Sequence, residues 1–292
     1  MIRTGDDVEI ARKAEGIIRL ALAEDLGVEG DVTTTAVCPT DARARAVIVS
    51  REPCVVAGQP VAEKVFALVA PEVSYDTVVG DGEKASGGGT IARLNGTLAG
   101  ILAGERTALN FLCHLSGIAT LTRRLVDIAG SSGVTVMDTR KTTPGMRALE
   151  KYAVSLGGGT NHRQGLFDGV IIKDNHIAAV GGLQIAVRRA GNSLAGRFPI
   201  EVEAATLAQV REAVDSGADI IMLDNMDPPA VREAVEIVAG RAKVEVSGGV
   251  GPDNLLSYAR LGVDAISMGF ITHSAPATDL SLELEVEESG LT

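Results

Sequence analysis

The 292-residue sequence has few aromatic residues: Phe, Trp and Tyr make up 3% of the chain, and Trp is absent. So few rings do not supply the stacking platforms on which single-stranded nucleic acids bind. The chain is also acidic, with 27 Lys and Arg against 38 Asp and Glu and a net charge of -11. An acidic surface repels a phosphate backbone, so both features argue against a nucleic-acid-binding protein.

Long apolar stretches and an export signal are also missing. No uninterrupted run approaches the roughly 20 apolar residues of a membrane-spanning helix, and the N-terminal "MIRTGDDVEIARKAEG" has no apolar signal core. Cys38, Cys54 and Cys113 form no Cys-x-x-Cys pair, so we expect buried thiols in a reducing compartment instead of disulfides or metal ligands. These features predict a cytoplasmic protein.

Several common catalytic signatures do not occur. The sequence contains no Gly-x-Gly-x-x-Gly, P-loop, His-Glu-x-x-His or Gly-x-Ser-x-Gly string. There are four histidines, and no two have the spacing of a metal-binding pair. The motifs therefore give no support for a dinucleotide-binding fold of that type, a P-loop enzyme or a structural zinc site.

What the sequence does contain, from about residue 134 onward, is a regular alternation of strand-like and helical patterns. In the segment after Thr206, a candidate N-cap, Leu207, Val210 and Val214 share one face and Gly217 ends the helix. Strands that alternate with such helices form parallel βα units. The fold class we predict is α/β, a closed or incompletely closed parallel barrel, with an open doubly wound sheet as the alternative. The strand-like runs are residues 134–139, 169–174, 200–204, 219–225, 243–249 and 265–270.

The first 115 residues have a different pattern, a helical opening followed by strand-like runs that Gly-rich turns interrupt. A long helical segment then leads into the barrel. The last segment, "LSLELEVEES", alternates apolar and polar residues, as a half-buried strand does. We predict an N-terminal α/β sandwich domain over 1–115, completed by a strand returning within 272–292, and a barrel catalytic domain over 116–271.

Polar residues end or follow the predicted barrel strands, where the active sites of parallel barrels lie. Arg140 and Lys141 follow the first run, with solvated surface charges as the alternative reading. Lys173 directly follows three apolar residues, so it either reaches the barrel mouth or is desolvated at a cost of several kcal/mol. Glu203 and Glu201 alternate and therefore share one side of their strand, and an exposed strand-end carboxylate is the simpler alternative.

The later strand ends combine a carboxylate with Gly-rich turns. Asp224 follows the apolar run "IIML", where an Asx-turn is the alternative. "SGGVGPDN" lies between a strand and a helix, which places free backbone N–H groups where a phosphate would bind, and "SMGFITHS" offers a second small turn. Phosphate sites of such barrels lie on the last two strand loops. A tight turn without a ligand is the alternative for each.

Residues 137–163 concentrate positive charge in this acidic chain. The segment "DTRKTTPGMRALEKYAVSLGGGTNHRQGLFDGVIIKDNH" closely resembles the signature of the quinolinate phosphoribosyltransferases. The resemblance extends over nearly the whole chain, through "EDLG", "GDVTT", "ERTALNFLCHLSGIAT", "EVE", "LDN", "SGG" and "THS" in order. Phe270, where a smaller residue is expected, and the acidic extension after Glu283 depart from the pattern.

The resemblance implies a type II phosphoribosyltransferase of NAD biosynthesis, with an α/β barrel and an N-terminal sandwich. Such an enzyme combines quinolinate with phosphoribosyl pyrophosphate (PRPP) and forms nicotinate mononucleotide, pyrophosphate and carbon dioxide with Mg²⁺. It also implies a homodimer. The acidic PRPP loop of the first structural type does not occur in this sequence.

The resemblance assigns roles to residues at matching positions. Planar Arg side chains suit carboxylates, whereas Lys suits concentrated phosphate charge. Arg106 would come from the neighbouring subunit, and Lys141 would reach the pyrophosphate. Glu203 and Asp224 would stabilise charge on the ribose and contact its hydroxyls or the water ligands of the metal. The quinolinate ligands would be Arg106, Thr139, Arg140, His162, Arg163 and Lys173, and the phosphate ligands Lys141, Ser247, Gly248, Gly249 and Gly269. Arg147 and Lys151 are expected to be surface charges.

Three other functions fit parts of the pattern. A relative from molybdenum systems would share the fold, but "DTRKT" and "IKDNH" favour the quinolinate enzyme. An aldolase-type barrel would use Lys173 or Lys141 as a Schiff-base nucleophile. A non-catalytic sugar-phosphate binder would keep the phosphate turns, but it would need neither the basic cluster nor the two carboxylates.

Overall fold

The computed structural model describes residues 5–286, with side chains described within 7–284. These residues divide into two compact units. The first unit contains the described residues up to Arg123, the segment Thr142–Gly158 and the described residues from Thr272 onward. The second unit contains Arg124–Lys141 and Gly159–Ile271.

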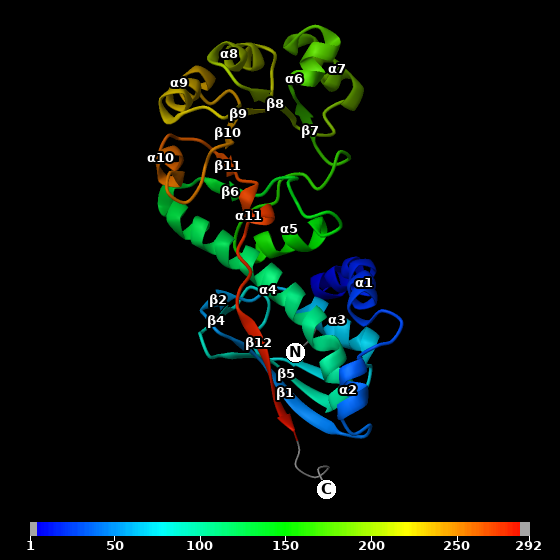
Figure 1. The fold of residues 1–292 in the computed structure, drawn as a ribbon. Helices are drawn as coiled ribbons and strands as arrows, with labels where there is room; N and C mark the ends of the chain where they lie inside the picture. Colours follow the sequence, from blue (N-terminus) through cyan, green and yellow to red (C-terminus); the bar gives the residue numbers. More distant parts are fainter. Residues whose placement is uncertain (1–4, 287–292) are drawn as a thin grey trace. The chain divides into compact units, whose positions relative to one another are not determined.

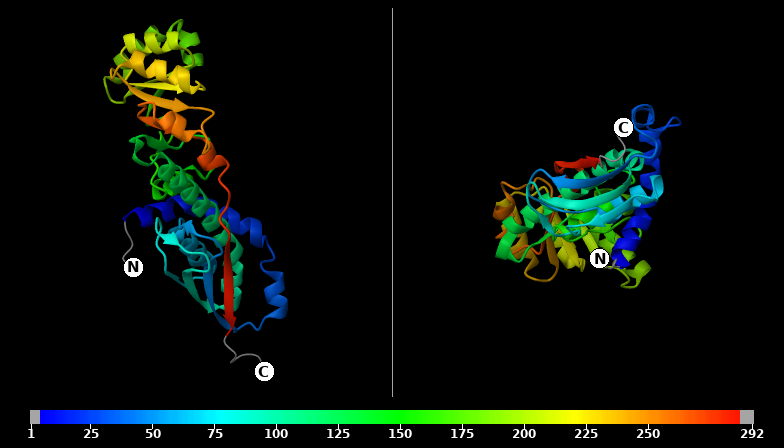
Figure 2. Two further views of the ribbon diagram at one scale, coloured as in Figure 1. Left: turned by 90° about the vertical axis from the view of Figure 1, so that its left-hand side faces the viewer. Right: turned by 90° about the horizontal axis from the view of Figure 1, so that it is seen from below.

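The first unit is built on a four-stranded antiparallel sheet in the order β12-β1-β5-β3. The last strand runs beside the first, with Ser50 opposite Leu280 and Ala44 opposite Val286 (Figures 1 and 2). Leu280 is buried and Leu284 is 37% exposed, so the inward face of β12 becomes more exposed toward its end. The strands are β1 (Arg43–Ser50), β3 (Ser74–Thr77), β5 (Thr90–Thr97) and β12 (Leu280–Val286), and a separate pair is β2 (Cys54–Val55) and β4 (Lys84–Ala85).

Helices pack closely in this unit because glycines allow short distances between them. A Cβ atom on Gly104 would lie 2.5 Å from the Phe66 ring, and one on Gly100 would lie 2.7 Å from Ala70 Cβ. Phe66 is wholly buried and stacks on Tyr75 with ring centroids 5.9 Å apart. The helices are α1 (Gly5–Leu26), α2 (Val32–Val37), α3 (Gln59–Val69), the first part of α4 (Leu98–Ala129) and α5 (Arg147–Leu156).

The second unit is a six-stranded sheet in the order β6-β11-β10-β9-β8-β7, in which all neighbouring pairs are parallel (Figure 1). The two end strands, β6 and β7, are not paired with each other in the described residues. The predicted α/β class with an incompletely closed parallel barrel is therefore confirmed, and every predicted strand is present. The strands are β6 (Thr135–Met137), β7 (Val170–Ile172), β8 (Ile200–Ala204), β9 (Ile220–Asp224), β10 (Lys243–Ser247) and β11 (Ala265–Ser267).

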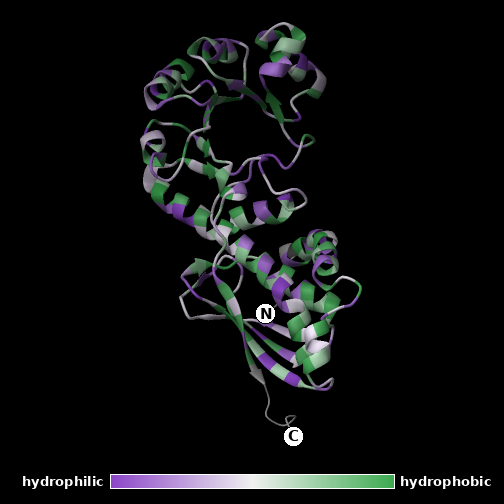
Figure 3. Ribbon diagram, in the orientation of Figure 1, coloured by the Kyte–Doolittle hydropathy of each residue, from purple (hydrophilic) through white to green (hydrophobic). Residues whose placement is uncertain are grey.

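The helices of the second unit are amphipathic and short, with hydrophobic and hydrophilic residues on each of α7, α8 and α9 (Figure 3). Thr206 caps α8 as the sequence predicts, because its Oγ1 accepts a hydrogen bond from the Gln209 N–H at 3.3 Å. The helices are η1 (Gly130–Ser132), α6 (Asp174–Val180), α7 (Leu183–Leu194), α8 (Leu207–Asp215), α9 (Pro228–Val238), α10 (Leu255–Ala259) and α11 (Phe270–His273), the last of which continues into the first unit. No helix in the described part of the chain has the length and apolar character needed to span a membrane.

Two expectations about burial are wrong. Lys151 was expected at the surface, but its side chain is wholly buried on α5, next to the equally buried Glu150. The structural reason is that other segments of the chain cover the polar side of this helix. Glu150 accepts a hydrogen bond from the Thr143 N–H at 3.1 Å, and its Oε1 lies 2.9 Å from His114 Nε2. Arg147 is half-buried, and its Nε donates to Thr142 Oγ1.

The cysteines are the second case. All three are free, but only Cys54 is buried, whereas Cys38 and Cys113 are partly exposed. Cys54 lies on the short strand β2, where Ser50 Oγ contacts its Sγ at 3.3 Å. Cys38 directly follows the short helix α2, which explains its partial exposure.

Candidate active site

The register of the parallel strands brings the predicted carboxylates to one face of the sheet. Glu203 lies opposite Met222, and Asp224 lies opposite Ser247. Paired residues of neighbouring strands point to the same face, and so do residues two apart on one strand. This face therefore carries Glu203, Asp224 and Ser247 near the strand ends, and it also carries Glu201 and Glu245, two residues before Glu203 and Ser247.

Lys173 and Glu203 form an ion pair at this edge. Lys173 directly follows β7, and its Nζ donates to a carboxylate oxygen of Glu203. Its main-chain N–H donates to His176 Nδ1 at 3.0 Å, at the beginning of α6. The structure thus brings together two of the predicted site residues, one cationic and one acidic.

The loop after β6 adds two more cations. Lys141 is exposed, and its main-chain N–H donates to Thr139 Oγ1 at 3.0 Å. Arg140 is half-buried and close enough to Arg163 that its charge, after burial, is the second cause that lowers the pKa of Arg163. Two neighbouring guanidinium groups that repel each other are suited to binding a strongly anionic ligand.

His162 and Arg163 are held in place by hydrogen bonds at both ends. The His162 N–H donates to Oδ1 of the buried Asp138 at 2.8 Å. The Arg163 N–H donates to His162 Nδ1 at 2.7 Å, and Arg163 Nη1 donates to the carbonyl of Gly169 at 2.9 Å. Sequence reasoning assigned no role to Asp138, since its bond to His162 joins segments that are 24 residues apart.

A buried pair of carboxyl groups lies against the His162 ring. Glu201 is 4% exposed and Glu245 is 3% exposed. His162 Nε2 lies 3.3 Å from Glu201 Oε2 and 3.6 Å from Glu245 Oε1. One ligand atom from each of the three residues falls within 4.8 Å of the others, a set that could hold a cation. The charge of Glu201 also acts on Arg163, whose pKa it raises against the larger effect of burial. The guanidinium of Arg163 is therefore a source of positive charge close to this pair.

The chemistry of this pair depends on burial. Burial, and secondly the charge of Glu201, raise the pKa of Glu245 to about 7, although His162 and Ser267 act in the opposite direction. Sequence reasoning placed Glu201 on the inner side without a role and overlooked Glu245. Its signal was available, because Glu245 precedes Ser247 by two residues and must share its face.

The raised pKa of Glu245 predicts a pH-dependent effect of Glu245→Gln on stability. Between 4.5, the ordinary value, and about 7 the folded protein keeps a proton that the unfolded chain has lost, so the stability of the wild type falls as pH rises through this range. The glutamine variant does not titrate at this position and therefore lacks this fall in the free energy of unfolding, which is on the order of 3 kcal/mol.

Urea unfolding at pH 5 and pH 8 measures this difference. We expect the variant to gain stability relative to the wild type on going to pH 8, whereas the exposed Glu236→Gln shows no pH-dependent gain. An equal difference in unfolding free energy at both pH values would contradict the prediction.

The turn after β10 has a conformation that requires glycine. Gly248 and Gly249 have φ of +89° and +68°, and Asn225, after β9, also has a positive φ of 54°. The Asn225 N–H donates to the carbonyl of Ser247 at 2.8 Å. A Cβ atom on Gly248 would lie 2.3 Å from Asn225 Oδ1, whereas one on Gly249 would meet nothing within 4 Å. A larger residue at 248 would therefore have to displace the side-chain amide of Asn225 and adopt a left-handed backbone conformation.

We expect Gly248→Ala to raise the KM for PRPP at least about tenfold, since the added methyl group displaces Asn225 and the turn, with on the order of 1–3 kcal/mol of strain. Gly240→Ala, after α9, is the matched control, because it has a similar positive φ of +72° and a Cβ atom there would meet nothing within 4 Å. Steady-state kinetics with varied PRPP measures the effect, and equal KM values for the two variants would refute the role of the Asn225 contact.

One predicted residue, Arg106, lies in the other unit. Gly269, by contrast, stays at the edge of the strand ends: it follows β11, whose Ser267 pairs with Ser247, by two residues and is half-buried, and Phe270, the residue that departs from the family pattern, begins α11. Arg106 is exposed on α4 and belongs to the first unit. The acidic extension after Glu283 falls largely outside the described residues.

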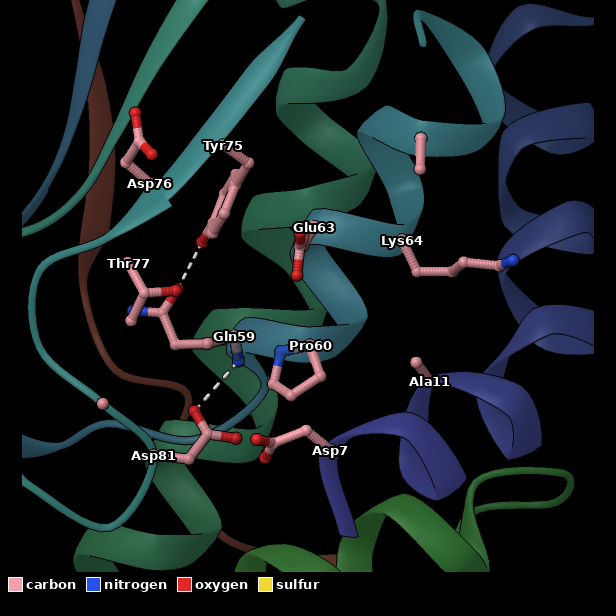
Figure 4. Close-up of a pocket in the computed structure, with 12 residues that line it drawn as sticks. Asp7, Ala11, Gln59, Pro60, Glu63, Lys64, Tyr75, Asp76, Thr77 and Asp81 are labelled. Carbon is pink, nitrogen blue, oxygen red and sulfur yellow. Dashed lines mark hydrogen bonds between the residues drawn. The ribbon is translucent and has the colours of Figure 1, made fainter. Parts of the chain in front are cut away.

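The first unit has a polar cavity of about 540 Å³ that contains none of the predicted site residues (Figure 4). Asp81 accepts from the N–H groups of Gly58 and Gln59 at 2.9 and 3.0 Å and so caps α3. Tyr75 donates to the side-chain carbonyl of Gln59. These contacts give the polar groups of this cavity a structural role.

An incompletely closed parallel barrel with cations, carboxylates and a glycine turn at its strand ends, together with an antiparallel α/β unit, agrees with the architecture that the resemblance implies, that of a phosphoribosyltransferase of the second structural type. Models of the N-terminal and C-terminal domains of quinolinate phosphoribosyl transferase match residues 31–116 and 118–283. The chain belongs to the quinolinate phosphoribosyltransferase family.

Individual relatives agree over nearly the whole length. A probable nicotinate-nucleotide pyrophosphorylase [carboxylating] of Bacillus subtilis is 41% identical, covering 92% of each chain. The protein of the same name from Methanothermobacter thermautotrophicus is 45% identical, covering 92% of this chain and 98% of its own. The solved nicotinate-nucleotide pyrophosphorylase of Francisella tularensis superposes with a TM-score of 0.90 at 37% identity, covering 94% of this chain and 97% of its own.

Proposed function

We propose that the protein transfers the phosphoribosyl group of PRPP to the ring nitrogen of quinolinate, releasing pyrophosphate, and that the product then loses carbon dioxide to give nicotinate mononucleotide. The observation that carries the proposal is the paired guanidinium groups of Arg140 and Arg163 in a barrel whose strand ends also carry Glu203 and Asp224. Guanidinium groups suit the carboxylates of quinolinate. Carboxylates suit the positive charge that develops on the ribose of PRPP.

The cations bind the acceptor substrate. Quinolinate has two adjacent carboxylates, and Arg side chains donate paired hydrogen bonds to such groups. Arg140 and Arg163 would hold the two carboxylates, with Thr139 and Lys173 beside them. Lys173 would exchange part of its contact with Glu203 for the substrate. The half-buried position of Arg163 strengthens its interaction, because water screens the charge less.

The carboxylates act on the donor substrate. As the bond from ribose C1 to pyrophosphate breaks, positive charge develops on the ribose ring, and Glu203 and Asp224 stabilise it electrostatically. The exposed Lys141 would neutralise the departing pyrophosphate, and the turn at Ser247, Gly248 and Gly249, with Gly269, would bind the 5-phosphate. Mg²⁺ bound with PRPP would neutralise pyrophosphate charge, and the half-buried oxygens of Glu203 and Asp224 suit its water ligands.

Decarboxylation needs little from the protein. Once the ring nitrogen carries the ribose it is cationic, and this charge stabilises the electron pair left on the adjacent carbon when carbon dioxide departs; a proton from water then bonds to that carbon and gives nicotinate mononucleotide. A cation on the departing carboxylate would not favour that step, so orientation and exclusion of water are the contributions of the site.

The direct test is release of carbon dioxide from carboxyl-labelled quinolinate in the presence of PRPP and Mg²⁺. We expect release that depends on all three, together with formation of nicotinate mononucleotide. Equal consumption of nicotinate, or no consumption of quinolinate, would refute the substrate assignment. Borohydride trapping of a carbonyl substrate on Lys173 would instead support the Schiff-base alternative, and the pairing of this amine with Glu203 argues against it.

We also propose that the active form is a homodimer in which Arg106 of one copy completes the quinolinate site of the other. The exposed position of this arginine on α4 supports the proposal, since a buried side chain would not reach a second chain.

A further inference from the structure

The His162 ring uses both nitrogens within the protein. Nδ1 accepts the Arg163 N–H at 2.7 Å and therefore carries no proton. The proton then lies on Nε2, which faces Glu201 at 3.3 Å and Glu245 at 3.6 Å. This arrangement differs from the role that family resemblance assigns to His162, since a substrate ligand would direct a ring nitrogen at the carboxylates of quinolinate.

The two glutamates have no other role in the proposed chemistry. Glu201 precedes Glu203 by two residues and Glu245 precedes Ser247 by two residues, and both are at least 96% buried. Burying two carboxyl groups side by side is costly unless a hydrogen-bond donor faces them. The Nε2–H of His162 faces both members of the pair, and the Ser267 hydroxyl also acts on Glu245.

We propose that Glu201 and Glu245 are positioning residues of the quinolinate site: they fix the His162 ring, whose Nδ1 holds the main chain of Arg163 and so directs the Arg163 guanidinium at the substrate. This inference rests on the proposed function and deepens it. It attributes specificity for the dicarboxylate to a chain of contacts, called the relay below, that runs from Glu201 and Glu245 through the His162 ring to Arg163.

The remaining contacts make the ring the adjustable part of this relay. Asp138 fixes the main chain of His162, and the Gly169 carbonyl fixes the guanidinium of Arg163. The groups that face Nε2 fix the orientation of the ring. In this orientation Nδ1 accepts the Arg163 N–H. Without the carboxylates the ring turns, and the Arg163 N–H loses its acceptor. Burial and the charge of Glu201 raise the pKa of Glu245 to about 7, as expected for two carboxyl groups buried side by side.

The test uses substitutions that preserve volume. Glu201→Met fills the same space without an acceptor, and we expect it to raise the KM for quinolinate about tenfold, the value of one charge-assisted hydrogen bond. Glu201→Gln keeps an acceptor oxygen, and we expect a KM within about threefold of the wild type because a neutral acceptor still orients the ring. The KM for PRPP and kcat should change little in both. Glu236→Met, an exposed glutamate on α9, is the matched control.

A double-mutant cycle separates positioning from a general structural role. In a His162→Ala background, Glu201→Met should leave the KM for quinolinate unchanged, because the carboxylate acts only through the ring. Additive effects, equal losses for quinolinate and PRPP, or a wild-type KM in Glu201→Met would each overturn the proposal. If Glu201→Met does not fold, Glu245→Met, which also removes the acceptor, replaces it in the same cycle, and an additive result there overturns the proposal too. An inactive wild type would refute the proposed function itself.

Discussion

We expect Arg163→Ala to lower kcat/KM for quinolinate by about a hundredfold or more, because under the proposed function the half-buried guanidinium donates at least two charge-assisted hydrogen bonds to a carboxylate. Most of the effect should appear in the KM for quinolinate, whereas the KM for PRPP changes much less. Steady-state kinetics with each substrate varied in turn measures both values.

Two further variants sharpen this result. Arg163→Lys should recover little activity, since a lysine keeps the charge but has no planar pair of donors. Arg188→Ala, an exposed arginine on α7, should behave like the wild type. A change in kcat/KM of less than about threefold in Arg163→Ala would show that the guanidinium does not bind the substrate.

Arg106→Ala should lose quinolinate turnover as severely while its circular dichroism and melting temperature stay close to those of the wild type, since the side chain is exposed. If a second copy supplies this arginine, co-expression of Arg106→Ala with Arg163→Ala creates heterodimers with one intact site. Random pairing then gives about a quarter of the wild-type activity, because half of the dimers keep one of two sites.

Mass spectrometry of the co-purified material establishes that heterodimers are present. Heterodimers without activity would contradict the shared site. If the co-expressed material were no more active than each variant alone, the shared site would also be contradicted.

The sequence was sufficient to predict the barrel strands because each is a short β-branched run followed by a polar residue. The strand Ile200–Ala204 has its predicted bounds, and Thr206 caps the next helix as expected. These features depend on neighbours in the chain. The assignments of Arg140, Arg163, Glu203 and Asp224 to substrates came from a family resemblance, and they stay predictions until kinetics tests them.

What the sequence did not reveal depends on tertiary contacts. Lys151 has the spacing of a surface charge on a helix, and only the fold shows that its side chain is buried. The contact of Asp138 with His162 joins residues far apart in the chain. Glu245 is different, since a period of two from Ser247 already places it on the inner face, and only its proximity to Glu201 and His162 required the structure.

The pairing of β1 with β12 also bears on how the protein folds during synthesis. These strands form consecutive hydrogen-bonded pairs although more than two hundred residues separate them. A ribosome must therefore finish the whole barrel before the sheet of the first unit gains its last strand. Until then β1 keeps an unpaired edge, which is a site for misassociation with other nascent chains. The barrel is thus expected to become compact first, and closure of this long loop is expected to be a late and slow event.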